Sequence, residues 1–89
     1  MKTYKFLVSG RVQGVWFRKY TKEIADKLKI NGYVRNLEDG RVEVVVTLKE
    51  IQFDNFLKAL KKGPPLSDVK DIEVEELDEI YTDGFEIVR

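Results

Sequence analysis

The segment from residue 10 to residue 18, Gly-Arg-Val-Gln-Gly-Val-Trp-Phe-Arg, has the residue types of an anion-binding loop. Gly14 allows the backbone to curl so that successive amide groups converge on one point. Arg18 follows where a helix is expected to begin, and the free amides and dipole of a helix N-terminus also favour an anion. Its guanidinium can donate two parallel hydrogen bonds to a phosphate. A tight strand-to-helix connection with Arg18 as a surface charge is the alternative, and these residues alone leave both open.

The amino-acid types that are absent limit the chemistry further. The nucleotide-binding patterns G-x-x-x-x-G-K-[ST] and G-x-G-x-x-G do not occur in the chain. There is no cysteine, which excludes thiolate chemistry, and no histidine, which excludes the commonest general base and the commonest zinc ligand. Any catalysis must therefore use carboxylates, lysine, arginine, hydroxyls, side-chain amides or the backbone.

Length and charge indicate the general class of protein. The 89 residues predict one domain, residues 1–89. Lys plus Arg and Asp plus Glu each number 16, and this zero net charge argues against a nucleic-acid partner. No apolar run is long enough for a membrane span or a signal peptide, so we expect a protein that does not bind membranes. The absence of cysteine is typical of a reducing compartment, so we expect a cytoplasmic location. The 36% of charged residues are typical of a heat-tolerant, thermophilic protein.

The hydrophobic periodicity predicts five strands and two helices. Asn31-Gly32 is expected to end the first helix, with Gly32 in a left-handed turn, and Gly63-Pro64-Pro65 is expected to end the second. The predicted strands are residues 4–10, 33–37, 41–48, 69–77 and 85–88. The first predicted helix begins at residue 17 and ends at Asn31-Gly32, and the second runs from about residue 50 to residue 62.

The resulting order, β-α-β-β-α-β with a short extra C-terminal strand, is that of an α+β ferredoxin-like sandwich with two helices on one face of an antiparallel sheet. The first and third strands should lie side by side, which brings the end of the second strand within reach of the 10–18 loop. Strand alternation places Asn36 on one face and Arg35 on the other, so Arg35 is not expected to share a site with Asn36. Ile72 and Val74 are expected to point inward from the fourth strand.

Three stretches resemble one known family. Residues 10–18 closely resemble the signature of acylphosphatases, and residues 32–37, Gly-Tyr-Val-Arg-Asn-Leu, with their continuation to residue 43, resemble its second motif. Residues 81–87 are similar to the final strand of the family, so the resemblance covers the whole chain. Two positions stand out. Leu37 replaces the threonine of many members, which removes a hydroxyl near the site, and Trp16 lies where members vary; we expect it to be either a packing aromatic or a wall of the acyl pocket.

The resemblance implies a metal-independent hydrolase, with no cofactor, that cleaves the carboxyl–phosphate bond of small acyl phosphates and releases a carboxylate and inorganic phosphate. By position, Arg18 matches the phosphate-binding arginine of the family and Asn36 matches the asparagine that orients the attacking water. The backbone amides that match its phosphate cradle belong to Gln13, Gly14, Val15, Trp16, Phe17 and Arg18. We expect a monomer.

Two other functions remain compatible with this fold, because a ferredoxin-like sandwich serves many activities. One is a non-catalytic module that binds a small anion, which would need the loop but not Asn36. The other is an RNA-binding module, which would place exposed aromatic side chains on its central strands. The third strand, RVEVVVTL, has no aromatic residue.

Overall fold

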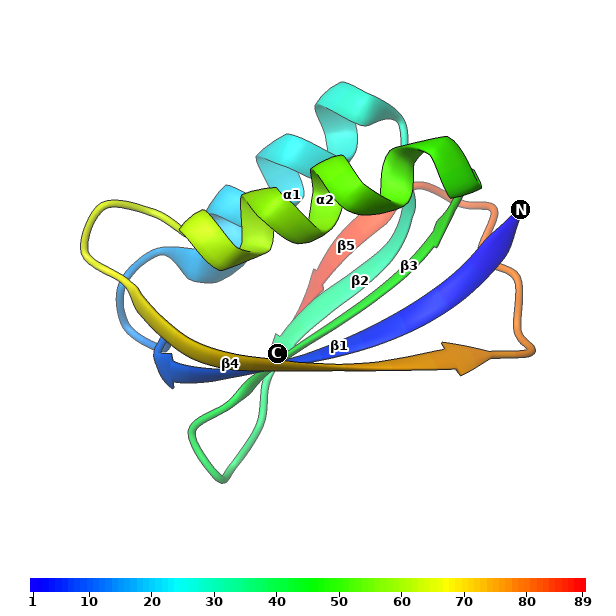
Figure 1. Cartoon of the computed structure of the whole chain (residues 1–89). Helices are drawn as coiled ribbons and strands as arrows, with labels where there is room; N and C mark the ends of the chain where they lie inside the picture. The colour runs from blue at the N-terminus through cyan, green and yellow to red at the C-terminus, as the bar shows by residue number, and fades with distance from the viewer.

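The computed structural model describes all 89 residues and confirms the predicted order of elements. Figure 1 shows the two helices together on one side of the sheet. No helix has both the length and the apolar character needed to cross a membrane. The elements are β1 (Lys2–Arg11), α1 (Phe17–Leu28), β2 (Asn31–Asn36), β3 (Val42–Leu48), α2 (Glu50–Lys62), β4 (Asp68–Leu77) and β5 (Phe85–Val88).

The five strands form one sheet in the order β4-β1-β3-β2-β5. β1 is antiparallel to both β3 and β4, and β2 is antiparallel to β3. The ferredoxin-like arrangement is therefore confirmed, including the neighbouring positions of β1 and β3. The short β5 pairs parallel with β2, so the complete sheet is mixed.

The core lies between the helices and one face of the sheet. Phe6 and Val8 of β1 and Phe56 and Leu60 of α2 are fully buried there. The central strand β3 is buried along its whole length, because β1 and β2 flank it on both sides. Ile72 and Val74 of β4 pair with Val8 and Phe6 of β1, so both lie on the inner face as expected, and Ile72 packs against the core. Val74 is nevertheless 43% exposed. Its exposure follows from the position of β4 as an edge strand, with no second neighbouring strand to cover it.

The end of α1 differs from the sequence prediction. Lys29, with a φ of 57°, adopts the left-handed conformation that closes the helix, and its amide donates to the carbonyl of Asp26 at 3.2 Å. Gly32 lies inside β2, opposite Val46 of β3. A Cβ at Gly32 would clash with the carbonyl oxygen of Val45, so the glycine permits close strand pairing and does not form the helix stop.

Candidate active site

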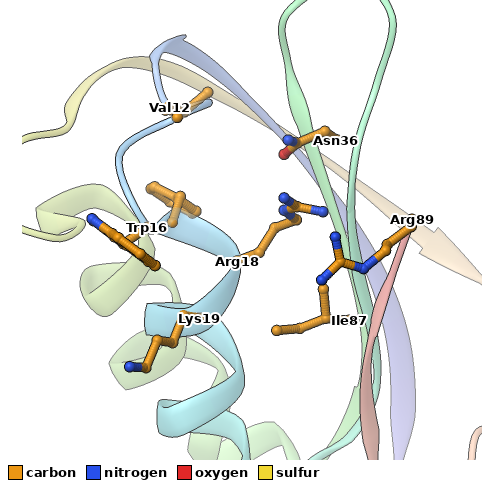
Figure 2. Close-up of a pocket in the computed structure, with 9 residues that line it drawn as sticks. Val12, Trp16, Arg18, Lys19, Asn36, Ile87 and Arg89 are labelled. Carbon is orange, nitrogen blue, oxygen red and sulfur yellow. The ribbon is translucent and has the colours of Figure 1, made fainter.

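The C-terminal ends of three strands lie at the same end of the sheet. β1 and β2 are both antiparallel to β3, so they run in the same direction, and β5 is parallel to β2. Their last residues are Arg11, Asn36 and Val88. The segment between β1 and α1 begins at this end of the sheet, and Figure 2 shows it facing Asn36 across a cavity. Sheet topology therefore brings together segments from the start, middle and end of the chain.

The segment between β1 and α1 exposes backbone donors because its apolar side chains point into the core. Val12, Val15 and Phe17 are buried, whereas Gly14 is exposed and has a φ of 74°, which favours glycine. None of the six amide groups from residue 13 to residue 18 donates to a backbone carbonyl. No acidic residue lies in the first turn of α1 and no side chain caps it. The predicted cradle is thus a run of unpaired N–H groups at a helix N-terminus, which favours an anion.

A cavity of about 310 Å³ lies beside this run of amides. Three of its lining residues are cations, Arg18, Lys19 and Arg89, and none is acidic. Neither Arg18 nor Arg89 takes part in any ion pair of the protein. Figure 2 shows the guanidinium of Arg18 between Asn36 and the guanidinium of Arg89. The full lining consists of Val12, Gly14, Trp16, Phe17, Arg18, Lys19, Asn36, Ile87 and Arg89.

Asn36 presents an unsatisfied acceptor in this cavity. Its Oδ1 atom is buried and has no hydrogen-bond partner within the protein. Figure 2 shows its side-chain amide directed toward Arg18. An acceptor left in this state costs about 1–3 kcal/mol of stability, because it has lost its hydrogen bonds to water. A small ligand with a hydrogen to donate, such as a water molecule, would satisfy it.

The face of β2 opposite the cavity contains a separate polar cluster, as strand alternation predicted. Arg35 Nε donates to Glu43 Oε1 at 3.0 Å, and Tyr33 Oη donates to the same oxygen at 2.9 Å. Burial, together with this hydrogen bond, raises the pKa of Tyr33 to about 12. The prediction that Arg35 does not share a site with Asn36 is therefore confirmed. The side chain of Leu37 does not line the cavity either.

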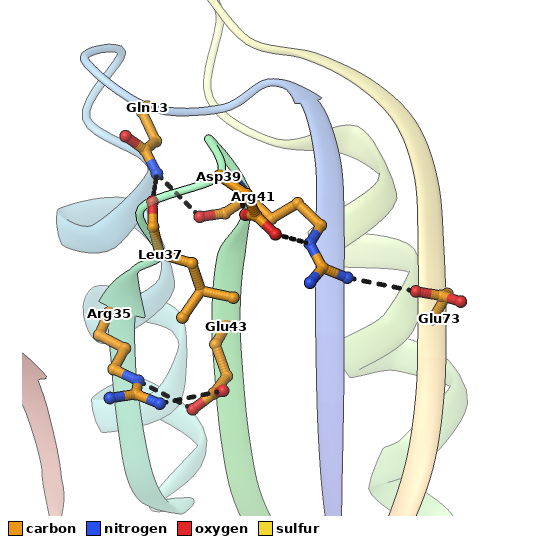
Figure 3. A network of polar contacts seen from close by, with 7 residues as sticks. All are labelled: Gln13, Arg35, Leu37, Asp39, Arg41, Glu43 and Glu73. Atoms are coloured by element: carbon orange, nitrogen blue, oxygen red, sulfur yellow. Dashed lines mark hydrogen bonds and ion pairs between the residues drawn. The ribbon is translucent and has the colours of Figure 1, made fainter.

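Gln13 connects the amide run to the hairpin that follows Asn36. Its Nε2 atom donates to the carbonyl of Leu37 at 2.7 Å and to the carbonyl of Arg41 at 2.8 Å, as Figure 3 shows. From the sequence, only the backbone amide of Gln13 was predicted to belong to the site. No spacing signal could have identified this contact, because its two ends are 24 and 28 residues apart in the chain.

Several lining residues were not predicted. Val12, Lys19, Ile87 and Arg89 all face the cavity. Ile87 and Arg89 reach it because β5 pairs in parallel with β2, placing Ile87 opposite Val34. Trp16 also lines the cavity, but its side chain is 72% exposed, so the expectation of a packing aromatic was wrong. No group of three or more His, Cys, Asp or Glu residues could hold a metal ion.

Comparisons with known proteins agree on one family. The family model described as Acylphosphatase matches residues 4–87. An acylphosphatase of Archaeoglobus fulgidus is 44% identical over 87 residues, which is 98% of both chains. One of Bacillus licheniformis is 48% identical over 86 residues, covering 97% of this chain and 93% of the relative. The crystal structure of the Bacillus subtilis acylphosphatase superposes with a TM-score of 0.94 over the full length of both chains, at 42% identity.

Proposed function

The chain belongs to the acylphosphatase family, and from this premise we propose which of its groups carry out the reaction. The activity of the family is hydrolysis of the carboxyl–phosphate bond of an acyl phosphate, which produces a carboxylate and inorganic phosphate. Arg18 and the amides of residues 13–18 bind the phosphate group, and Asn36 orients the attacking water. The observation that supports this assignment is that the unpaired donors and the orphan Oδ1 of Asn36 border one cavity.

The phosphate group lies where the unpaired amides and the Arg18 guanidinium can donate to its oxygens. Such donors are already oriented before the substrate arrives, so they stabilise the charge that redistributes over those oxygens in the transition state. Removing one donor from a site of this kind typically raises the barrier by about 2.7–4 kcal/mol. Lys19 and Arg89 increase the attraction for a dianion, since no acidic side chain in the lining opposes them.

The nucleophile is a water molecule that donates a hydrogen bond to Asn36 Oδ1. This bond directs a water lone pair toward phosphorus and fixes the geometry, which is the main requirement of phosphoryl transfer. The water oxygen forms a bond to phosphorus while the bond from phosphorus to the acyl oxygen breaks. Asn36 is neutral, so the water proton passes to a phosphate oxygen of the substrate and no protein base is needed.

The leaving group explains how a chain without histidine can perform this reaction. The electron pair of the broken bond remains on a carboxylate, which is a weak base and departs without protonation. A general acid is therefore unnecessary. The groups that the cavity provides, namely amides, guanidinium and carboxamide, are sufficient for positioning and for charge stabilisation.

Hydrolysis of benzoyl phosphate, followed by ultraviolet absorbance, tests this function directly. We expect turnover by the unmodified protein and competitive inhibition by inorganic phosphate. Arg18→Ala should lose both turnover and phosphate inhibition while its circular dichroism spectrum remains that of the folded protein. Phosphate binding without any turnover would favour the non-catalytic anion-binding module instead, and activity retained by Arg18→Ala would refute the assignment of this arginine.

We further propose that residues 1–89 act as a single domain, as a monomer in the cytoplasm of a thermophile, on a small molecule and without a nucleic-acid partner. The balanced charge supports the absence of a nucleic-acid partner, and the absence of cysteine supports a cytoplasmic location. Light scattering at micromolar concentration, a thermal unfolding scan and a titration with single-stranded RNA test its parts. A dimer mass, a midpoint typical of mesophilic proteins or saturable RNA binding would contradict the corresponding part.

A further inference from the structure

Trp16 combines a strained backbone with an exposed side chain. Its φ of 69° and ψ of 20° lie in the left-handed region, which bulky residues rarely adopt. Gly14, two residues earlier, has a similar φ of 74° and no side chain to strain. The indole is mostly exposed, so burial of the ring does not offset the strain at Trp16. Strained residues without a packing role are concentrated at functional sites.

The protein holds the indole at the helix N-terminus and not against the core. Trp16 takes part in none of the aromatic pairs of the structure. Its contact is with Lys19, whose Nζ lies 5.9 Å from the ring centroid. Because Lys19 follows one helical turn later, this cation–π interaction restricts the ring to the rim of the cavity.

The indole separates two hollows in the surface. One is the cavity that contains Arg18 and Asn36. The second, about 270 Å³, lies next to it and is lined by Trp16, Lys19, Tyr20, Glu23 and Pro64. A side chain that lines two adjacent hollows has the position of a wall between them.

The apolar part of the cavity must accommodate the acyl group, because the donors and Asn36 are assigned to phosphate and water. Val12 and Phe17 are each 1% exposed and offer almost no accessible surface. Trp16 and Ile87 therefore provide the accessible apolar lining, and Trp16 is the larger and more exposed of the two.

Trp16 and Ile87 lie on different sides of the cavity. Figure 2 shows Trp16 on the segment before α1, on the other side of Arg18 from Ile87, whereas Ile87 and Arg89 come from the strand next to Asn36. The indole therefore belongs to the segment whose amides are assigned to the phosphate group. Because the acyl group is bonded to that phosphate, Trp16 is favoured over Ile87 as its apolar neighbour.

We propose that Trp16 is the wall of the acyl pocket and that it makes the enzyme prefer aromatic acyl phosphates to small aliphatic ones. The inference rests on the proposed function of the same cavity. A flat acyl group such as benzoyl can stack on the indole, whereas acetyl has too little surface to do so.

The test compares kcat/KM for benzoyl phosphate and acetyl phosphate in the protein, Trp16→Gly and Trp16→Phe. Glycine removes the ring and tolerates the positive φ, whereas phenylalanine keeps an aromatic ring. We expect the benzoyl-to-acetyl ratio to fall about three- to tenfold in Trp16→Gly and to recover in large part in Trp16→Phe. Using a ratio cancels any effect on the backbone amide of Trp16, and the inhibition constant of inorganic phosphate measures that effect separately.

Ile51→Ala is the matched control, since Ile51 is an exposed apolar residue, 84% accessible, that does not line the cavity. Its ratio should equal that of the unmodified protein. A ratio that changes less than twofold in Trp16→Gly would overturn the inference, as would a fall that Trp16→Phe does not restore.

A second measurement needs no variant, because Trp16 is the only tryptophan of the chain. Phenylphosphonate should change the indole emission at saturation and bind about three- to tenfold more tightly than methylphosphonate. Equal affinities and equal indole emission for the two phosphonates would contradict the proposal that Trp16 forms the wall of the acyl pocket. If neither acyl phosphate were hydrolysed, the proposed function would fail, while this titration would still decide whether Trp16 borders the ligand.

Discussion

Gln13 and Leu37 are joined by a 2.7 Å hydrogen bond from the side-chain amide of Gln13 to the backbone carbonyl of Leu37. Leu37 directly follows Asn36, and Gln13 begins the run of amides that ends at Arg18. One side chain therefore fixes the distance between the proposed phosphate cradle and the proposed water-orienting residue. Because catalysis by positioning is lost with displacements of about 1 Å, this contact should influence turnover as well as stability.

Gln13→Ala should reduce both stability and turnover. It removes two hydrogen bonds and leaves the carbonyls of Leu37 and Arg41 without this donor. We expect a loss of about 1–3 kcal/mol in the free energy of unfolding, measured by urea denaturation, and a fall in kcat. Gln52→Ala is the matched control, since Gln52 also donates to a backbone carbonyl, that of Leu28 at 3.2 Å, but lies outside the cavity. An unchanged kcat in Gln13→Ala would show that the contact is structural only.

Asn36→Ala should lower kcat by about a hundredfold, by analogy with the loss of one oriented catalytic group. The inhibition constant of inorganic phosphate should change little, because Asn36 contacts water and not phosphate in the proposed mechanism. Removing the orphan Oδ1 should leave the fold as stable as before or stabilise it slightly. A large rise in the phosphate inhibition constant with kcat intact would assign Asn36 to phosphate binding instead.

Arg89→Gln should weaken phosphate inhibition about three- to tenfold, because it removes one of the three cations that line the cavity. The difference from the unmodified protein should shrink as salt is added, since part of the site is open to solvent. Arg11→Gln is the control, because Arg11 lies at the same end of the sheet as the cavity but is not part of the cavity lining. Equal effects of the two substitutions would reduce the role of Arg89 to general surface charge.

Alkaline pH should weaken the cluster on the opposite face of β2. Burial and the bond to Glu43 raise the pKa of Tyr33 from 10.0 to about 12 in the folded state. The folded protein thus holds this proton more tightly, and its stabilising effect is complete below pH 10.0 and is lost as the pH rises through about 12. The stability difference between the protein and Tyr33→Phe, from urea denaturation, should shrink over that range. A constant difference would show that the ionisation of Tyr33 does not affect the free energy of unfolding.

Chelating agents should leave hydrolysis unchanged, and added magnesium should not stimulate it. The proposed mechanism assigns charge stabilisation to Arg18 and the loop amides, and the cavity lining contains no Asp or Glu side chain to hold a divalent cation. Benzoyl phosphate hydrolysis with and without ethylenediaminetetraacetate checks this. An activity that disappeared with the chelator and returned with magnesium would be incompatible with the mechanism.

Local patterns in the sequence were sufficient for the order of elements and for part of the site. Hydrophobic periodicity identified both helices and the strands because an apolar face has to be buried in the same way wherever the element lies. The glycine of the loop and Arg18 indicated an anion-binding loop as one of two interpretations, since an amide run at a helix N-terminus is a local structure, and the resemblance to acylphosphatases favoured it. Alternation along β2 also separated Arg35 from Asn36 correctly.

Only the tertiary structure determined what lies next to these local features. The left-handed residue at the end of α1 is Lys29, while Gly32 is required by the close approach of β3, which no local pattern records. The contacts of Gln13 and the entry of Arg89 into the cavity depend on strand pairing between distant parts of the chain. Chain periodicity predicts which face a side chain occupies, but the neighbours on that face depend on sheet order and on parallel or antiparallel pairing. For this reason the sequence could predict a candidate anion-binding loop, whereas the complete cationic cavity could not be predicted from it.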